Sequence, residues 1–145
     1  MRRKQLWMEY VAVAAGGVVG AFLREGIELL LSARLTDHIP LATLFINWTG
    51  SLFLGWFYTR TIWHWRVQQW VRAGLGTGLV GAFTTFSTFS VESVQLLGQN
   101  AALGILYIVA SAVGGIGLSQ IGMRLAGEQP EQKREPSLKA RTIED

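Results

Sequence analysis

The sequence predicts an all-α membrane protein with four transmembrane helices. Half of its 145 residues are hydrophobic and only 16% are charged, against about 25% in an ordinary soluble domain. The charges gather in bands separated by uncharged stretches of 14, 21, 19 and 31 residues, and a helix needs roughly 20 mainly apolar residues to cross a bilayer. The chain has no Cys, which excludes disulfide frameworks, thiol catalysis and Cys-zinc sites.

The first helix is predicted over residues 7–32. Its uncharged stretch of 14 residues is short for a span, so we expect Trp7 and Tyr10 to extend it outward and Arg24 to sit at a hydrated depth. The apolar pattern continues into the run GIELLL, and no small-residue cleavage motif ends it. We therefore interpret the segment as a membrane helix and not as a signal peptide.

The other three helices are predicted over residues 41–61, 70–97 and 101–125, where the uncharged stretches are about long enough for a span. Nearly all of their faces are apolar, which disfavours a soluble helical bundle. Aromatic residues gather where the second helix ends and the third begins, as expected at a membrane–water interface. They are Trp56, Tyr58, Trp63, Trp65 and Trp70.

The end of the chain differs from everything before it. Residues 127–145 carry nine charges and two prolines, and such a segment buries too little apolar surface to fold alone. The sequence therefore predicts a transmembrane domain over residues 1–126 and a disordered, charged tail over residues 127–145.

Lys and Arg residues before the tail predict the orientation. With four spans, both termini lie on one side of the membrane, together with seven of these residues: Arg2, Arg3, Lys4, Arg60, Arg66, Arg72 and Arg124. The other side has two, Arg24 and Arg34. Because cytoplasmic loops carry the excess of positive charge, we predict cytoplasmic termini and a multi-pass protein of the cytoplasmic (inner) membrane.

The third helix combines glycines with hydroxyl groups. Glycines in small-residue spacing allow membrane helices to pack closely, and this explains most of those at residues 16–20, 74–81 and 114–117. It does not explain five hydroxyl residues in mid-span, which are Thr84, Thr85, Ser87, Thr88 and Ser90. An isolated Ser or Thr usually bonds back to its own helix. Five of them beside a glycine-rich stretch favour a break in the helix, which is tolerated at membrane depth only inside protein or along a watery cavity.

Two more polar residues are predicted within spans, and each has two interpretations. Asn47, on the second helix, is either a hydrogen-bonding contact between helices or a side-chain amide that donates to an anion. Arg24 is either functional or neutralised, by reaching the membrane surface or by pairing with Glu25 or Glu28. The residue types alone do not choose between these interpretations.

The remaining pattern favours an anion as the transported species. Phe86 and Phe89 are three residues apart and share a helix face beside the hydroxyl groups, so they are candidate lining residues. Glu9 and Glu92 are expected to flank spans, which argues against a proton-coupled exporter with an acidic relay. No nucleophile with a base and an orienting residue is visible, so an enzyme is not predicted.

Three motifs together resemble those of the Fluc/CrcB fluoride channels. They are GGVVGAFLR (16–24), TLFINWTGSLFLG (43–55) and GAFTTFSTFSVE (81–92), and their order and spacing agree over about residues 10–125. The resemblance implies a fluoride-selective channel that exports fluoride passively and reduces the cellular fluoride concentration. It also implies an antiparallel, dual-topology dimer in which each subunit has a break in its third helix.

The resemblance also assigns individual residues. Those that match the fluoride pore are Asn47, Phe86, Phe89, Ser87, Thr88, Tyr107, Ser111 and Arg24. It implies that the two phenylalanines line the ion path with their ring edges, that Tyr107 begins a polar track on the fourth helix, and that Arg24 lies in a vestibule. Gly81 and Thr84 match the helix-break positions whose backbone carbonyls hold a structural Na⁺ at the dimer centre.

One feature departs from the family pattern. An antiparallel homodimer needs subunits inserted in both directions, whereas the Lys and Arg residues are divided seven to two. A paralogous subunit of opposite orientation is therefore one possible partner. A homodimer is favoured, because this chain keeps Asn47 and both phenylalanines.

Two other functions fit part of the pattern. A small multidrug or guanidinium-type exporter also has four helices, but it needs a mid-membrane Glu in the first helix, where the candidate Glu9 lies at the helix start. A non-transporting membrane assembly protein would explain the glycines but would leave the hydroxyl run without a role.

Overall fold

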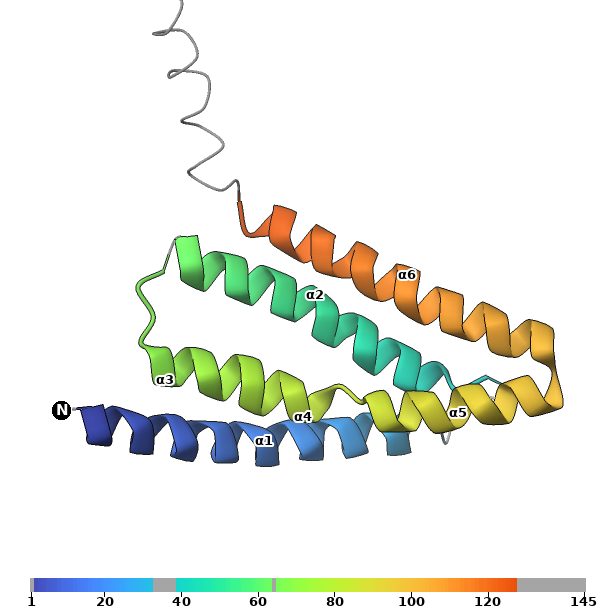
Figure 1. Ribbon diagram of the computed structural model, residues 1–145, viewed down its shortest axis with the longest axis horizontal. Coiled ribbons are helices and arrows are strands. Elements are labelled where there is room, and N and C mark those ends of the chain that lie inside the picture. Colours follow the sequence, from blue (N-terminus) through green and yellow to red (C-terminus); the bar gives the residue numbers. More distant parts are fainter. Residues whose placement is uncertain (1, 33–38, 64, 128–145) are drawn as a thin grey trace, which may run out of the picture.

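The computed structural model describes residues 2–32, 39–63 and 65–127 (Figure 1). Every regular element among them is helical. In chain order they are α1 (Arg2–Ser32), α2 (Leu41–Trp63), α3 (Gln69–Arg72), η1 (Ala73–Val80), α4 (Gly81–Phe83), α5 (Phe86–Gln99) and α6 (Ala101–Leu125). The predicted tail lies outside the described residues apart from Gly127, and so does Arg34.

Helices occupy all four predicted regions, and α6 has the predicted bounds of 101–125. Two of the described helices, Arg3–Leu31 and Ala101–Leu125, are long and apolar enough to cross a membrane. The other two regions do not meet the same test. α2 has 23 residues that include amide, hydroxyl and indole groups, and the third region is divided into elements that are each shorter than a span.

The third region changes geometry along its length. η1 is a π-helix of eight residues, AGLGTGLV, and π-helical segments are rare and often found at functional sites. α4 follows and ends at Phe83. Thr84 has an extended backbone (ψ 155°) and Thr85 does too (φ −140°, ψ 126°), so two extended residues separate α4 from α5.

Glycines bring α1 and η1 into backbone contact. A Cβ atom at Gly16 would overlap the carbonyl oxygen of Gly74, and one at Gly20 would overlap that of Leu79. From the other side, a Cβ at Gly78 would lie 2.6 Å from the carbonyl oxygen of Val13. Each helix thus places its small residues against the backbone of the other, which is how membrane helices associate when dispersion forces drive packing.

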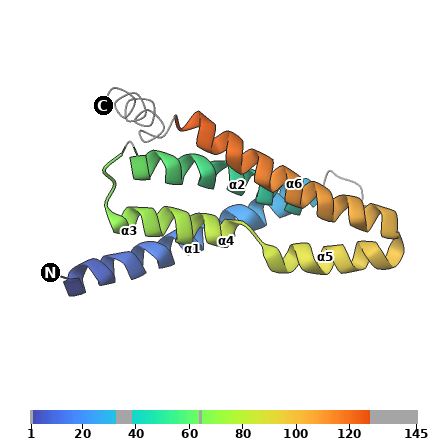
Figure 2. The ribbon, with the colours of Figure 1, turned by 45° about the horizontal axis from the view of Figure 1, so that its top comes forward.

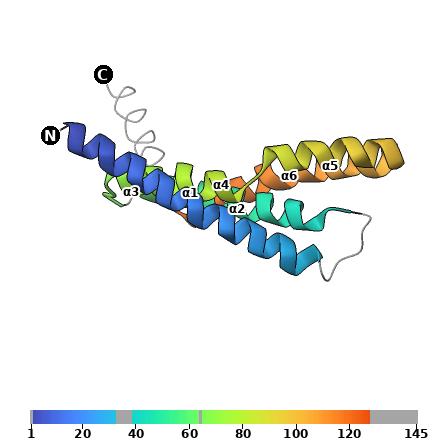
Figure 3. The same ribbon diagram turned by 90° about the horizontal axis from the view of Figure 1, so that it is seen from below.

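Close glycine contacts also join α2 to α6, which lie side by side in Figures 1 and 2. A Cβ at Gly55 would overlap the backbone of Ser119, and one at Gly122 would overlap the carbonyl oxygen of Leu52. Gly114 leaves space for the indole ring of Trp48. Figure 3 shows α5 running beside α6 and beyond the end of η1 and α4.

One end of the molecule gathers the start of α1, the start of α3 and the ends of α2 and α6 (Figure 1). Arg60 donates to the carbonyl oxygen of Ala126 at 2.8 Å, and Arg72 donates to that of Thr61 at 3.0 Å. Both guanidinium groups therefore satisfy carbonyls at helix C-termini, where positive charge is favourable. The Arg60 guanidinium also lies 5.6 Å from the ring centroid of Trp65.

Most large apolar side chains lie on the outside. Phe22, Phe86 and Val94 are each exposed over more than 70% of their surface, whereas few large apolar residues are buried. Such a surface is far more apolar than that of a monomeric soluble protein. It is suited to a bilayer or to a partner chain.

Candidate functional site

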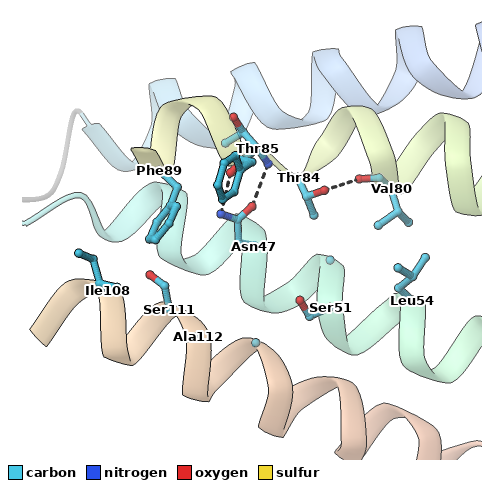
Figure 4. Close-up of a pocket in the computed structure, with 13 residues that line it drawn as sticks. Asn47, Ser51, Leu54, Val80, Thr84, Thr85, Phe89, Ile108, Ser111 and Ala112 are labelled. Atoms are coloured by element: carbon cyan, nitrogen blue, oxygen red, sulfur yellow. Dashed lines mark hydrogen bonds between the residues drawn. The ribbon is translucent and has the colours of Figure 1, made fainter. Parts of the chain in front are cut away.

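A cavity of about 500 Å³ lies between α2, the Thr84–Thr85 break and α6 (Figure 4). Its walls are mainly apolar, with amide and hydroxyl groups set into them. The residues that line it are Asn47, Gly50, Ser51, Leu54, Val80, Thr84, Thr85, Phe86, Phe89, Ile108, Ser111, Ala112 and Gly115. No Asp, Glu, Lys or Arg is among them.

Asn47 holds the break in place. Its Nδ2 donates to the carbonyl oxygen of Thr85 at 3.0 Å, and its Oδ1 accepts from the Thr85 N–H at 2.9 Å. These two bonds pair a side-chain amide with a backbone peptide that has left the helix (Figure 4). An amide nitrogen carries two hydrogens, so the second N–H of Asn47 remains available at the cavity.

Thr85 also caps α5. Its Oγ1 accepts from the Thr88 N–H at 3.2 Å and donates to the Thr88 hydroxyl at 3.0 Å. The Ser87 hydroxyl lies 3.3 Å from the same oxygen. The first amides of a helix have no acceptor within the helix, and the N-terminal end carries a partial positive charge. The positive end of α5 is therefore held beside the cavity.

Three aromatic rings continue from the cavity along α5 and α6. The ring centroids of Phe86 and Phe89 are 5.9 Å apart, and those of Phe89 and Tyr107 are 5.6 Å apart. Phe86 is 80% exposed, so one face of this row is open in the single chain. Ring edges carry partial positive charge, which makes the row compatible with an anion.

The carboxylate of Glu92 lies at the end of this row of aromatic rings. Glu92 Oε2 accepts from the Tyr107 hydroxyl at 2.8 Å, and Glu92 Oε1 accepts from the Thr43 hydroxyl at 2.8 Å. These bonds join α5 to α6 and to α2. The sequence argument placed Glu92 at the edge of a span and did not predict these contacts. In the structure Glu92 lies in the middle of α5 and accepts hydrogen bonds from two other helices.

The predicted pore residues divide into two groups. Asn47, Phe86, Phe89 and Ser111 line the cavity, and the Ser111 Oγ is buried without a hydrogen-bond partner. The others lie next to it or further away. Ser87 and Thr88 belong to the first turn of α5, and Tyr107 reaches the cavity through the ring of Phe89.

Arg24 lies on α1, away from the cavity, where its Nε is 3.8 Å from Glu28 Oε1. This contact matches one of the two interpretations of Arg24, that of a residue paired with a neighbouring glutamate. Both side chains are about one-third exposed, at 32% and 31%, and an ion pair with this exposure contributes at most about 1 kcal/mol to stability.

The two residues predicted to bind Na⁺ lie at the two ends of α4: Gly81 is its first residue and Thr84 directly follows its last. Thr84 lines the cavity, and its hydroxyl and its N–H both donate to the Val80 carbonyl, at 2.9 Å each. The Thr85 N–H, which would bond to Gly81 in a continuous helix, donates to Asn47 instead. The Gly81 carbonyl thereby loses its usual donor. Within the described ranges, no three His, Cys, Asp or Glu residues are placed to hold a metal ion.

Sequence reasoning did not select Thr43, and it considered Glu92 only as a residue that flanks a span. Both stand inside the motifs that carried the resemblance, Thr43 at the start of TLFINWTGSLFLG and Glu92 at the end of GAFTTFSTFSVE. Thr43 is also four residues before Asn47, on the same face of α2. That spacing was the available signal for Thr43.

Comparison with known proteins agrees with the resemblance drawn from the three sequence motifs. The family described as CrcB-like protein, Camphor Resistance (CrcB), matches residues 11–123. "Fluoride-specific ion channel FluC 2" of Geobacillus kaustophilus is 43% identical over 131 residues, which are 87% of this chain and 97% of that protein. "Fluoride-specific ion channel FluC 1" of Moorella thermoacetica is 42% identical over 120 residues, 82% of this chain and 86% of that protein.

Proposed function

The chain belongs to the CrcB family, and we propose that it is a fluoride-selective ion channel that lets fluoride leave the cell passively and so lowers the cellular fluoride concentration. The observation that carries the proposal is the cavity beside the break. An amide N–H, a buried hydroxyl and the positive end of a helix meet there, and no carboxylate lines it.

Fluoride is small and strongly hydrated, so a channel must replace its water with other donors. The second N–H of Asn47 and the buried Ser111 hydroxyl are such donors. The edges of Phe86 and Phe89 offer weaker contacts. Conduction requires binding that is favourable enough for entry and weak enough for release, and a mixture of strong and weak donors meets both conditions.

The partner that completes the pore is proposed to be a second copy of the chain in antiparallel orientation. Phe86 is 80% exposed beside an open cavity, and Gly81 has no atom within 4 Å of the position of a Cβ. A second subunit would cover both. The chain is also proposed to lie in the cytoplasmic membrane, with several spans and both termini inside the cell. The support is the basic end of the molecule, which contains Arg60, Arg66 and Arg124, because cytoplasmic segments carry the excess of positive charge.

The experiment is fluoride efflux from liposomes that contain this chain alone, measured beside chloride efflux. Rapid fluoride release with little chloride release supports the channel and shows that one kind of subunit suffices. No release from a well-folded dimer, followed by release when a paralogous chain is co-expressed, would replace the homodimer by a heterodimer. Release in neither case would overturn the function.

The first variant to test is Asn47→Asp. Aspartate cannot donate to the Thr85 carbonyl and adds a negative charge beside the cavity, so we expect fluoride efflux to fall by at least about tenfold, equivalent to ~1.4 kcal/mol. Asn100→Asp is the matched control. Asn100 caps α6 by accepting from the N–H groups of Ala102 and Leu103, a role that Asp performs equally well. Unchanged efflux in Asn47→Asp would contradict the proposal.

A structural Na⁺ is proposed beside α4, with the backbone carbonyls of Gly81 and Thr84 among its ligands. Support comes from the break, which leaves the Gly81 carbonyl without its usual donor, and from the preference of hard cations for oxygen ligands. The ion would supply positive charge that offsets the cost of bringing anions into a medium of low dielectric constant.

Sodium removal tests this site. A ligand that binds only the folded protein raises the melting temperature, so we expect a higher melting temperature of the purified protein in sodium salts than in N-methylglucamine salts of equal ionic strength. Equal melting temperatures in the two salts would count against the site.

A further inference from the structure

A second cavity, of about 330 Å³, lies between the start of α1 and the segment that leads into α3. Both segments belong to the basic end of the molecule (Figure 1). One carboxylate, three amides, a thioether and an indole line the cavity. The lining residues are Gln5, Met8, Glu9, Gln68, Gln69 and Trp70. None of them lines the cavity beside the break, so a ligand bound here would not occupy the candidate pore.

Glu9 is the charged group of this cavity. Among the described residues it is the only acidic one on the segments that meet at this end, where the basic residues are Arg3, Lys4, Arg60, Arg66, Arg72 and Arg124. Within those described residues, the Glu9 carboxylate has neither an ion pair nor a hydrogen bond. Glu9 is half-buried, and a carboxylate that has lost part of its water favours a compensating positive charge.

The other lining groups select the kind of cation. An ammonium group with N–H bonds can donate to the Glu9 carboxylate and to the amide oxygens of Gln5 and Gln69. The amide oxygen of Gln68 already accepts from the indole N–H of Trp70. This bond holds the indole ring at the cavity, and indole faces attract cations. A quaternary ammonium has no N–H bonds and would depend on the ring alone, so the lining favours a primary ammonium group.

The position of the cavity indicates a lipid as the source of that group. Trp7 and Tyr10 flank Glu9 along α1 and are 69% and 70% exposed, and Trp and Tyr collect at the level of the lipid headgroups. Lys4 is exposed as well. It lies one helical turn before Met8, on the same face of α1, and Met8 lines the cavity. A cation is thus close to the place where a headgroup phosphate would follow the ammonium group.

We propose that this cavity binds the headgroup of a phospholipid that ends in a primary ammonium group, as phosphatidylethanolamine does. Glu9 accepts hydrogen bonds from the ammonium group, Trp70 contributes its ring and Lys4 attracts the phosphate. The bound headgroup connects the start of α1 to the segment before α3, and it stabilises the folded protein. The inference uses the membrane location of the chain and does not depend on the channel function.

The test is thermal unfolding of the purified full-length protein in detergent micelles with added dioleoylphosphatidylethanolamine. A ligand that binds only the folded protein raises the melting temperature. Dioleoylphosphatidylcholine is the matched lipid, because it differs only by three methyl groups that replace the N–H donors. Charge-assisted hydrogen bonds are the strong ones, so we expect phosphatidylethanolamine to act at about tenfold lower concentration, equivalent to ~1.4 kcal/mol.

Variants show whether Glu9 is responsible. Glu9→Gln removes the charge and keeps the size of the side chain, so it should remove most of the preference for phosphatidylethanolamine. Glu25→Gln is the matched control and should keep the preference, because Glu25 is an exposed glutamate of the same helix that does not line the cavity. Should Glu9→Gln fail to give a monodisperse protein, Trp70→Leu removes the ring from the same cavity. It should weaken binding of phosphatidylethanolamine about threefold.

Four results would overturn the inference. They are equal action of the two lipids on the unaltered protein, a full preference in Glu9→Gln, an equal loss of preference in Glu25→Gln, and unchanged binding in Trp70→Leu. Equal stabilisation by water-soluble ethanolamine at the same concentration would overturn the assignment to a lipid. Fluoride efflux is not measured in this experiment, so a failure of the proposed channel function and a failure of this inference are distinguishable.

Discussion

The segments on either side of the Thr84–Thr85 break differ in how they contact the rest of the molecule. Before the break, η1 meets α1 through glycines, with backbone against backbone at Gly20 and Leu79. After the break, α5 is joined to its neighbours by side-chain hydrogen bonds, from Thr43 on α2 and Tyr107 on α6 to Glu92. One chain region thus changes from close packing to polar bridging within a few residues.

The difference indicates which contacts between helices are rigid and which can exchange their hydrogen-bond partners. A contact between backbones tolerates no added atom and has no alternative partner. A hydrogen bond to a carboxylate can be exchanged for one to another acceptor, since a hydroxyl rotates to suit its partner. The segment before the break therefore acts as the scaffold, and the segment after it is held by hydroxyl groups that can change their acceptor.

The largest loss of stability is expected when the close contact between α1 and η1 is disrupted. In Gly20→Ala, the new Cβ would overlap the carbonyl oxygen of Leu79. Overpacking typically costs about 1–3 kcal/mol, and the upper part of this range or more is expected because the neighbour is backbone. We expect a large fall in melting temperature and loss of the monodisperse peak in size-exclusion chromatography.

Gly26→Ala is the matched control on the same helix. No atom lies within 4 Å of a Cβ at Gly26, and Ala is favoured over Gly in helices by about 0.8–1.0 kcal/mol. This variant should be as stable as the original protein or more so. Equal losses in the two variants would show that the close contact with Leu79 does not hold α1 to η1.

A smaller loss of stability is expected when a hydrogen bond between α5 and α6 is removed. Tyr107→Phe keeps the ring that contacts Phe89 and removes the hydroxyl that donates to Glu92. Hydrogen bonds to charged groups contribute about 1.5–3 kcal/mol, and Thr43 still donates to the same carboxylate. Thermal unfolding should show a moderate loss of stability with the chromatographic profile preserved.

Ser93→Ala is the control for this variant. Ser93 is buried on α5 next to Glu92, but its hydroxyl donates to the Phe89 carbonyl of its own helix at 2.7 Å. Such bonds contribute little to helix stability, so the melting temperature should hardly change. A loss in Ser93→Ala as large as that in Tyr107→Phe would mean that bridging between helices is not what stabilises α5.

The sequence was sufficient for the features that follow from local pattern. The bounds of α6 follow from a long uncharged stretch, and the family resemblance, drawn from three motifs, is confirmed by the match over residues 11–123. Asn47, Phe86 and Phe89 could be selected because amides and aromatic rings in such motifs stand out against aliphatic neighbours.

Features that depend on contacts between distant segments could not be predicted in the same way. Thr43 and Glu92 are 49 residues apart, and nothing in either motif shows that they meet. The π-helical geometry of η1 also escaped prediction, because a glycine-rich run has little preference for one helical form and packing against α1 decides the outcome. The roles of Arg24, Gly81 and the other pore residues remain predictions from the resemblance.

The caps of α6 have a consequence for the surrounding lipid. Asn100 secures the first turn of the helix, and Arg60 holds the Ala126 carbonyl just beyond its last residue, so neither end is free to unwind. The 25 residues between them form a rod about 37 Å long, whereas the hydrocarbon layer of a typical bilayer measures about 30 Å. A rod of this length fits such a layer when it tilts, when its last turns with Gln120 and Arg124 reach the interface, or when the lipids next to it stretch. We therefore expect the length of the acyl chains to affect the inclination of α6, and through Tyr107 the carboxylate of Glu92.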